Sequence, residues 1–332
     1  MSETAFNTET PTAKPKGLFR DPVTVVSVIL SLAAIVWFFG FESRFGSNRS
    51  QSVFGWLESA WNGENDYEHG ILFPFVILGL IIYQFKALRE VAGKGSNLGL
   101  VAVFIGAALY AISYRTFQPR IAAGALPFLL WGGCYYVWGW RVARLLAFPF
   151  FFFWLAVPLP SFQQATTNLQ LLATSLAHHG SSLFGVETRV VGTTILPVNG
   201  DWKPLDIATG CSGIRSLMAL LMISSAWAYV AKIKMWQKAV LFMMALPLAI
   251  IGNALRVTSI FVIAEYGNAE WAAGTWHDWS GLLLFYPFSL FLLLVVHSVF
   301  EGGLPWKKAS KKKLSRQTVR KSGEETVFVA EP

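Results

Sequence analysis

Long apolar stretches alternate with short polar ones along most of the chain. Eight of them approach the roughly 17–25 residues that a helix needs to cross a bilayer. They are Val23–Phe41, Ile71–Leu88, Leu98–Tyr114, Ile121–Trp140, Val142–Pro160, Gly213–Val230, Ala239–Ala264 and Trp279–Phe300. The pattern predicts an all-α integral membrane protein with about eight transmembrane helices. The fourth and fifth, divided only by RVAR, are expected to form a tight helical hairpin.

The longest polar interruption, Ser161 to about Ser212, is also expected to carry structure. Apolar residues spaced by threes and fours predict an amphipathic helix on the outer surface: Phe162, Ala165, Leu169, Leu172 and Leu176. The Thr/Val-rich run that follows, together with the Asn199-Gly200 pair, favours a small β-hairpin between spans five and six.

The positions of Lys and Arg predict the orientation. With a cytoplasmic N-terminus, most of the 27 Lys and Arg residues fall on inner segments, and every inner loop holds at least two. Residues 1–22 are then a cytoplasmic tail and residues 23–302 a multi-pass domain of the inner membrane. Residues 303–332 form a basic cytoplasmic tail expected to touch anionic lipid.

Composition supports a membrane protein over a soluble one. The chain is 54% hydrophobic and only 14% charged, against roughly 25% charged residues in soluble domains. The net charge of +8 comes from inner loops and the tail, so we do not interpret it as a nucleic-acid signal. Two cysteines cannot build a disulfide framework. No internal repeat and no separate soluble domain is evident.

Cys211 is the first candidate for chemistry, in IATGCSGIRSL at the outer start of the predicted sixth span. A thiol at a helix N-terminus meets unpaired N–H groups and the positive end of the dipole, which favour the reactive thiolate. Arg215 adds positive charge, and Gly213 leaves room for a substrate backbone. Ser212 is a rival nucleophile that an N-cap role also explains. Alternatively Cys211 is a small buried residue, which is our interpretation of Cys134.

Arg256 lies late in the seventh apolar stretch, in GNALRV. A charged residue there costs about 2.5–3.5 kcal/mol on insertion scales, so it is expected to have a partner or a task. Asn253, three residues earlier on the same helical face, is placed to steady the guanidinium. The alternative is a snorkelling arginine that marks the helix end.

A histidine near Cys211 would carry the proton in an acyl transfer. His69 and His277 each adjoin the outer end of a predicted span, whereas His297 lies near an inner end. Spacing alone does not choose between His69 and His277. The topology therefore predicts that a cysteine, an arginine and at least one histidine meet at the outer membrane face.

Four motifs occur in an order that resembles the exosortase/archaeosortase family. They are DYEHGILFPF at the second predicted span, then CSGIRSL, NALRV and the histidine before WSGLLLF. The resemblance covers the chain from about Asp66 to the last span. One departure is Thr209, two residues before the cysteine, where many members have an acidic residue.

The resemblance implies a multi-pass membrane thiol protease and transpeptidase that acts on PEP-CTERM-type sorting signals. Its substrates would be secreted proteins with a C-terminal tail made of a Pro-Glu-Pro-like motif, a transmembrane helix and a basic cluster. Such systems are linked to exopolysaccharide and biofilm export. The active site would lie on the outer, periplasmic side.

The resemblance also implies roles for named residues, without a metal or an organic cofactor. Cys211 would be the nucleophile, Arg256 an oxyanion or substrate stabiliser, and His277 the general acid and base. The supporting or substrate-contacting candidates are Asn253, Arg215, Ser212, Gly213, Tyr67 and His69.

Two other classes of protein stay open. One is a transporter or assembly component of a polysaccharide export system, in which Arg256 contacts an anionic substrate. The other is an envelope scaffold in which Cys211 is inert. The lack of repeated halves argues against the transporter. The sequence does not set the recipient nucleophile or the oligomeric state.

Overall fold

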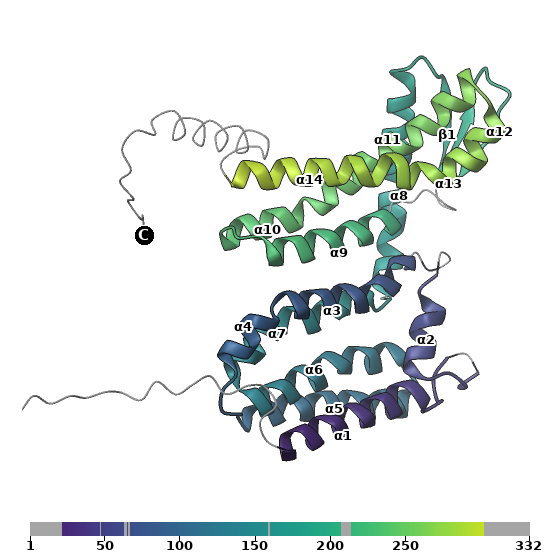
Figure 1. Ribbon diagram of the computed structural model, residues 1–332. Helices are drawn as coiled ribbons and strands as arrows, with labels where there is room; N and C mark the ends of the chain where they lie inside the picture. Colours follow the sequence, from purple (N-terminus) through teal and green to yellow (C-terminus); the bar gives the residue numbers. More distant parts are fainter. Residues whose placement is uncertain are drawn as a thin grey trace, which may run out of the picture. The chain divides into compact units, whose positions relative to one another are not determined.

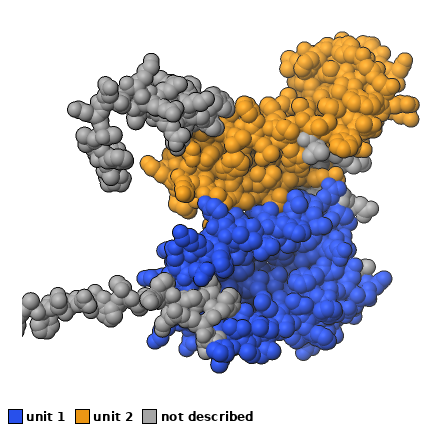
Figure 2. Space-filling model, viewed as in Figure 1, with its two compact units in different colours: residues 1–162 blue, residues 163–332 orange. Residues whose placement is uncertain are grey.

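The structure, a computed structural model, describes residues 22–46, 48–62, 65, 67–158, 160–206 and 214–301 (Figure 1). It is built mainly from helices. The chain forms two compact units, within each of which the residues contact mainly one another. They are residues 1–162 and 163–332, coloured separately in Figure 2. Almost all of the two tails predicted to be cytoplasmic lies outside the described residues.

Among the described residues, five helices are long and apolar enough to cross a membrane. They are Pro22–Phe41, Leu98–Thr116, Pro119–Trp138, Met235–Tyr266 and Leu283–Phe300. Glu68–Tyr83 and Phe85–Val91 add a sixth if this pair, bent by 54°, is one broken span. The described helix Arg215–Val230 is apolar but shorter. The chain is therefore an integral membrane protein, and the predicted count of eight spans is not confirmed.

Unit 1 contains seven labelled α-helices among its described residues. They are α1 (Pro22–Val36), α2 (Val53–Ala60), α3 (Phe73–Tyr83), α4 (Phe85–Val91), α5 (Leu98–Thr116), α6 (Pro119–Trp138) and α7 (Trp140–Phe151). The helices α5 and α6 pack most closely: a Cβ on Gly132 would lie 2.7 Å from the Val103 nitrogen and 2.8 Å from the Gly99 oxygen. Small residues allow this backbone approach, which drives helix association in membranes.

The predicted break between the fourth and fifth spans is wrong in position. Arg141 and Arg144 of RVAR lie inside α7, and the chain turns at Gly139 instead, with a φ of +81° that favours glycine. Basic side chains can extend from a helix to the membrane surface, so they do not have to end it. α7 continues into a 3₁₀ turn (Phe152–Ala156) and is not among the helices long enough to span.

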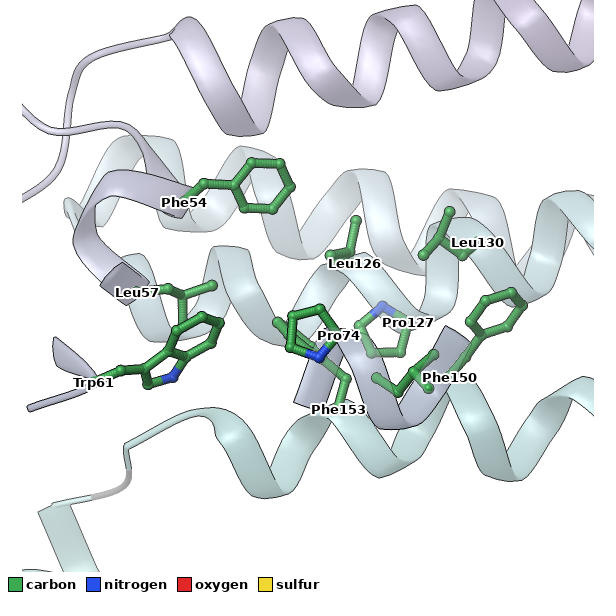
Figure 3. A pocket seen from close by; sticks show the side chains of 10 residues that line it. Phe54, Leu57, Trp61, Pro74, Leu126, Pro127, Leu130, Phe150 and Phe153 are labelled. Carbon is green, nitrogen blue, oxygen red and sulfur yellow. The ribbon is translucent and has the colours of Figure 1, made fainter. Parts of the chain in front are cut away.

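Two further features of unit 1 concern its interior. Cys134 packs against a cluster made by Leu88, Val142 and Leu146, in agreement with its expected packing role. A separate cavity of about 380 Å³ lies between α2, α3, α6 and the end of α7 (Figure 3).

Unit 2 combines a helical bundle with a small sheet. The bundle consists of α9 (Ile214–Val230), α10 (Met235–Met243), α11 (Ala245–Tyr266) and α14 (Tyr286–Phe300). Its buried cluster includes Leu217, Leu220, Leu241, Leu248, Phe285 and Leu293. The helix α8 (Pro160–Ser182) begins at the boundary between the units.

The β-hairpin predicted before the sixth span is confirmed, but its turn is elsewhere. The antiparallel strands are β1 (Thr188–Val191), β2 (Thr194–Pro197) and β3 (Leu205–Asp206), in the order β1-β2-β3. The first turn uses Gly192, whose φ is +63°, while Asn199-Gly200 lies in the connection from β2 to β3. A two-residue hairpin turn favours residues with a positive φ, because that backbone geometry matches the twist of the two strands. Gly192 has this conformation.

The amphipathic helix predicted from Phe162 to Leu176 is present as α8. Its buried face consists of small residues, including Ala173 and Ala177, which pack with the sheet and with α11. The stripe residues Leu172 and Leu176 are 41% and 37% exposed. Leu172 and Leu176 therefore remain on the surface of the unit, and the small residues allow the close helix packing.

Candidate functional site

The last described helix begins at Ala269, well before the predicted start at Trp279. It is interrupted by two π-helical segments, which are often found at functional sites. In order it consists of α12 (Ala269–Trp271), η5 (Ala272–Trp276), α13 (His277–Ser280), η6 (Gly281–Phe285) and α14. His277 thus opens the single α-helical turn between the two π-helical segments.

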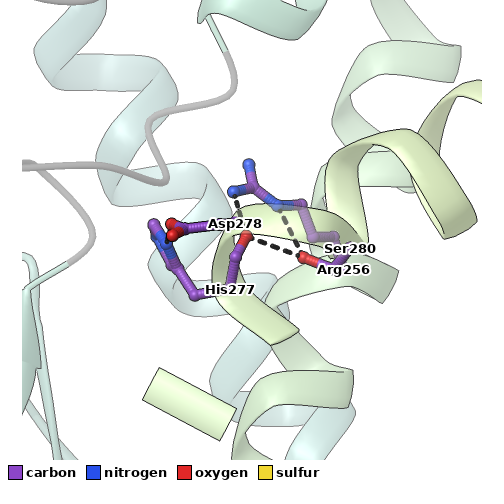
Figure 4. Close-up of polar contacts among 4 residues, drawn as sticks. All are labelled: Arg256, His277, Asp278 and Ser280. Carbon is purple, nitrogen blue, oxygen red and sulfur yellow. Dashed lines mark hydrogen bonds and ion pairs between the residues drawn. The ribbon is translucent and has the colours of Figure 1, made fainter. Parts of the chain in front are cut away.

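Arg256 projects from α11 onto this turn (Figure 4). Its Nε donates to Ser280 Oγ at 3.1 Å, and its Nη2 donates to the His277 carbonyl oxygen at 3.0 Å. Ser280 is fully buried and donates its own hydrogen to the same carbonyl at 3.1 Å. The guanidinium is therefore held by two directed bonds that use two of its five N–H donors.

Asn253 was expected to steady this guanidinium from its spacing alone. It is buried on α11, with 2% of its surface exposed. The described hydrogen bonds of the Arg256 guanidinium nevertheless go to Ser280 and His277.

The His277 ring lies beside an acidic side chain. Its Nδ1 is 3.0 Å from Asp278 Oδ1, and the two side chains are 22% and 77% exposed. An ionised carboxylate only accepts hydrogen bonds, so Nδ1 is the donor and the neutral ring carries its basic lone pair on Nε2. This is the tautomer control that a histidine acid–base catalyst requires.

Sequence reasoning missed three side chains that reinforce the contact between Arg256 and the His277 turn: Trp276, Ser259 and Ser280. Trp276 Nε1 donates to Ser259 Oγ at 2.8 Å, and Ser259 donates to the Arg256 carbonyl at 2.6 Å. Ser259 lies three residues after Arg256, and Ser280 three after His277, so both share a helical face with a candidate residue. That spacing is the signal that would have found them.

A glycine permits the approach of α11 to the last helix. Gly252 is buried one turn before Arg256, and a Cβ there would lie 2.7 Å from Phe285 Cδ2 and 2.9 Å from Ser289 Oγ. Phe285 belongs to η6 and is fully buried, so its ring cannot move aside into solvent. The close packing at Gly252 therefore sets the distance across which Arg256 reaches Ser280 and His277.

The remaining predicted site residues of the CSGIRSL motif are only partly covered. Cys211, Ser212 and Gly213 lie outside the described residues. Arg215 is partly buried in the first turn of α9. The structure thus brings Arg256 and His277 together, and the position of the thiol relative to them stays a prediction.

Tyr67 and His69 form a buried pair in unit 1. They are 2% and 7% exposed, and their rings stack with centroids 5.4 Å apart. Within the described part of the chain, neither ring nitrogen of His69 has a hydrogen-bond partner. A buried polar group without a partner is costly and calls for an explanation, which distinguishes His69 from His277.

The other candidate groups have local partners. His178 Nδ1 lies 2.6 Å from Thr188 Oγ1, and His179 Nδ1 lies 2.7 Å from the Ser175 carbonyl oxygen. Both histidines therefore have local contacts in α8 and β1. Among the described residues, no group of three or more His, Cys, Asp or Glu side chains is arranged to hold a metal ion.

A sequence model described as transmembrane exosortase matches residues 61–295, which is well over half of the chain and contains all four motifs. No curated protein and no solved structure matches the chain. The chain belongs to the transmembrane exosortase family.

Proposed function

We propose that this chain is a membrane-embedded cysteine protease and transpeptidase that cleaves C-terminal sorting signals of secreted proteins. Exosortases are a family of cysteine transpeptidases. The observation that carries the proposal is the pairing of Arg256 with the His277 turn, inside the region that matches the family. Cys211 in CSGIRSL supplies the nucleophile.

The reaction begins when His277 takes the proton of the Cys211 thiol, which leaves a thiolate. Its sulfur attacks the carbonyl carbon of the scissile peptide bond near the sorting motif, and the carbonyl oxygen takes up negative charge. The carbon–nitrogen bond then breaks, and His277 gives a proton to the departing amine. A thioester remains on Cys211, which an amine nucleophile or water resolves. No metal or organic cofactor enters this scheme.

Arg256 serves as the oxyanion or substrate stabiliser. Its bonds to Ser280 and His277 fix the plane of the guanidinium before substrate arrives. Its other N–H groups then supply charge-assisted hydrogen bonds to a developing oxyanion. A donor positioned in advance avoids the cost of reorganisation during the reaction.

The substrate is a membrane-anchored protein whose tail helix lies beside the spans. Anchoring raises the local concentration of the motif at Cys211. The site faces the periplasm, both termini face the cytoplasm, and the basic tail touches anionic lipid. Supporting contacts are assigned to Asn253, Arg215, Ser212, Gly213, Tyr67 and His69.

The test replaces Cys211 with serine in the full-length protein, co-expressed with a secreted reporter that carries a Pro-Glu-Pro-like motif, an apolar helix and a basic cluster. We expect reporter cleavage, followed by mass spectrometry, to fall by about 10³-fold or more, because the nucleophile is lost. Cys134→Ser is the matched control and should cleave normally, since Cys134 packs in unit 1. Normal cleavage by Cys211→Ser would favour a transporter or a scaffold instead.

A further inference from the structure

The cavity of unit 1 has an apolar wall. Leu126 and Leu130 of α6 and Phe153 after α7 contribute to it (Figure 3). Ile77 of α3 also lines it. Its polar side-chain atom, the indole nitrogen of Trp61, already donates to the Ala156 carbonyl at 2.8 Å. Water needs two to four polar partners to occupy a cavity, so this wall favours an apolar occupant.

The shape of the cavity is built into the backbone. Pro74 lies in the first turn of α3, and Pro127 lies inside α6, where it removes a helical hydrogen bond. Both proline rings line the cavity, together with the aromatic rings of Phe54 and Phe150. Proline and aromatic rings are rigid and cannot change shape to fill an adjacent space. The wall therefore cannot collapse onto the empty cavity. An empty cavity loses dispersion contacts that a hydrocarbon would restore.

The size of the cavity selects among apolar occupants. At about 380 Å³ it is more than twice the roughly 150 Å³ of an engineered apolar cavity that binds benzene. A transmembrane helix, about 10–12 Å wide and 30 Å long, occupies several times this volume. A single flexible hydrocarbon chain therefore fits where a protein helix does not.

A positive charge lies in the first turn of α6, one of the helices that line the cavity. The Arg120 guanidinium lies over the Trp56 ring, 5.6 Å from its centroid, and Trp56 adjoins the cavity residue Leu57. Along α6, Arg120 precedes Leu126 by about 9 Å. Arg120 Nε donates to the Pro158 carbonyl at 2.9 Å, and no described residue hydrogen-bonds its two terminal nitrogens. Such a fork suits a phosphate.

We propose that this cavity binds one hydrocarbon chain of a membrane phospholipid, whose phosphate contacts Arg120. This lipid site lies in unit 1 and does not depend on the proposed peptidase chemistry. Its occupant comes from the bilayer in which the chain is embedded.

The first experiment uses full-length protein in phospholipid nanodiscs with a few per cent of phosphatidylglycerol that carries a photoreactive diazirine on one acyl chain. Cross-linked peptides are compared by mass spectrometry. We expect labelling around Ile77 and Leu130, and a fall of about tenfold in Leu130→Trp, because the indole takes the space of the chain. Phe104→Trp, at a 74% exposed position on α5, is the matched control and should not reduce cavity labelling.

The second experiment separates a phospholipid from hydrocarbon in general. Arg120→Gln should lower cavity labelling by the phosphatidylglycerol probe and leave labelling by a diacylglycerol probe with the same chain unchanged. If the Leu130→Trp variant does not fold, Leu130→Phe places a smaller aromatic ring in the cavity. We then expect a partial loss of labelling. Equal labelling of the wild type and both filling variants overturns the proposal, and so does a cavity that neither probe labels.

Discussion

Arg256 shows how one costly residue is accommodated in an apolar helix. A charge in a membrane segment needs partners, and the partners here are a buried hydroxyl and a backbone carbonyl on the next helix. The bonds orient the guanidinium beside His277, whose ring is in turn oriented by Asp278. The side chain is thus better explained by a fixed position than by snorkelling at a helix end.

Replacing Arg256 by lysine should separate charge from geometry. Lysine keeps the charge but cannot form the planar fork that binds Ser280 and the His277 carbonyl together. We expect kcat/KM for the tailed reporter to fall by about 10²-fold, as for the loss of one oxyanion donor. Arg189→Lys, on the exposed part of β1, is the control and should cleave normally. Full activity of Arg256→Lys would show that its fork geometry is dispensable.

The two π-helical segments and the close approach of α11 together position the turn that holds His277. Segments η5 and η6 flank the turn that holds His277 and Ser280, and α11 packs against both. At Gly252 α11 lies close against the buried ring of Phe285. The packing of α11 against the last described helix therefore determines how Arg256 is aligned with the His277 turn.

A valine at Gly252 should disturb this alignment. Its side chain has to displace the buried Phe285 ring, and overpacking of this kind costs about 1–3 kcal/mol. We expect a lower unfolding temperature in detergent and a loss of reporter cleavage, because Arg256 would no longer reach the His277 turn. Gly79→Val on α3, where an added Cβ meets nothing within 4 Å, is the control and should change neither readout. An unaltered unfolding temperature for Gly252→Val would contradict the tight packing.

The small sheet constrains how unit 2 lies in a bilayer. Open strand edges cannot be exposed to lipid hydrocarbon, because their N–H and C=O groups would stay unpaired. The sheet packs with the end of α11 that includes Phe261, so this end of α11 belongs beyond the hydrocarbon. The positive-inside rule then predicts that the basic residues around Met235, at the other end of the same long candidate span, face the cytoplasm.

Cysteine accessibility should reveal this orientation. In a protein with Cys134→Ser and Cys211→Ser, we expect Val191→Cys on β1 to react with a membrane-impermeant maleimide at the periplasmic face. Met235→Cys should react only after the membrane is permeabilised. Val191 and Met235 are 57% and 79% exposed, so the membrane and not burial decides access. The reverse pattern would invert the proposed topology and place the site in the cytoplasm.

Sequence patterns were reliable where the physical cause is local. The apolar runs report residues that face lipid or a core. The predicted spans Leu98–Tyr114 and Ile121–Trp140 correspond to the described helices Leu98–Thr116 and Pro119–Trp138. The spacing of small and apolar residues predicted α8, and the Thr/Val run predicted the hairpin. Ends of elements were less well predicted: the turn after α6 depends on the backbone at Gly139, whereas the basic residues of RVAR are compatible with a helix.

The sequence by itself determined that this is an integral membrane protein of the transmembrane exosortase family, because hydropathy and ordered motifs are properties of the chain alone. Only the tertiary structure decided that Arg256 is held by Ser280 and the His277 carbonyl, and that an apolar cavity opens beside Leu130. Those features depend on how closely helices distant in sequence approach one another, a distance set by residues such as Gly252 and Pro127 through packing that no local pattern records.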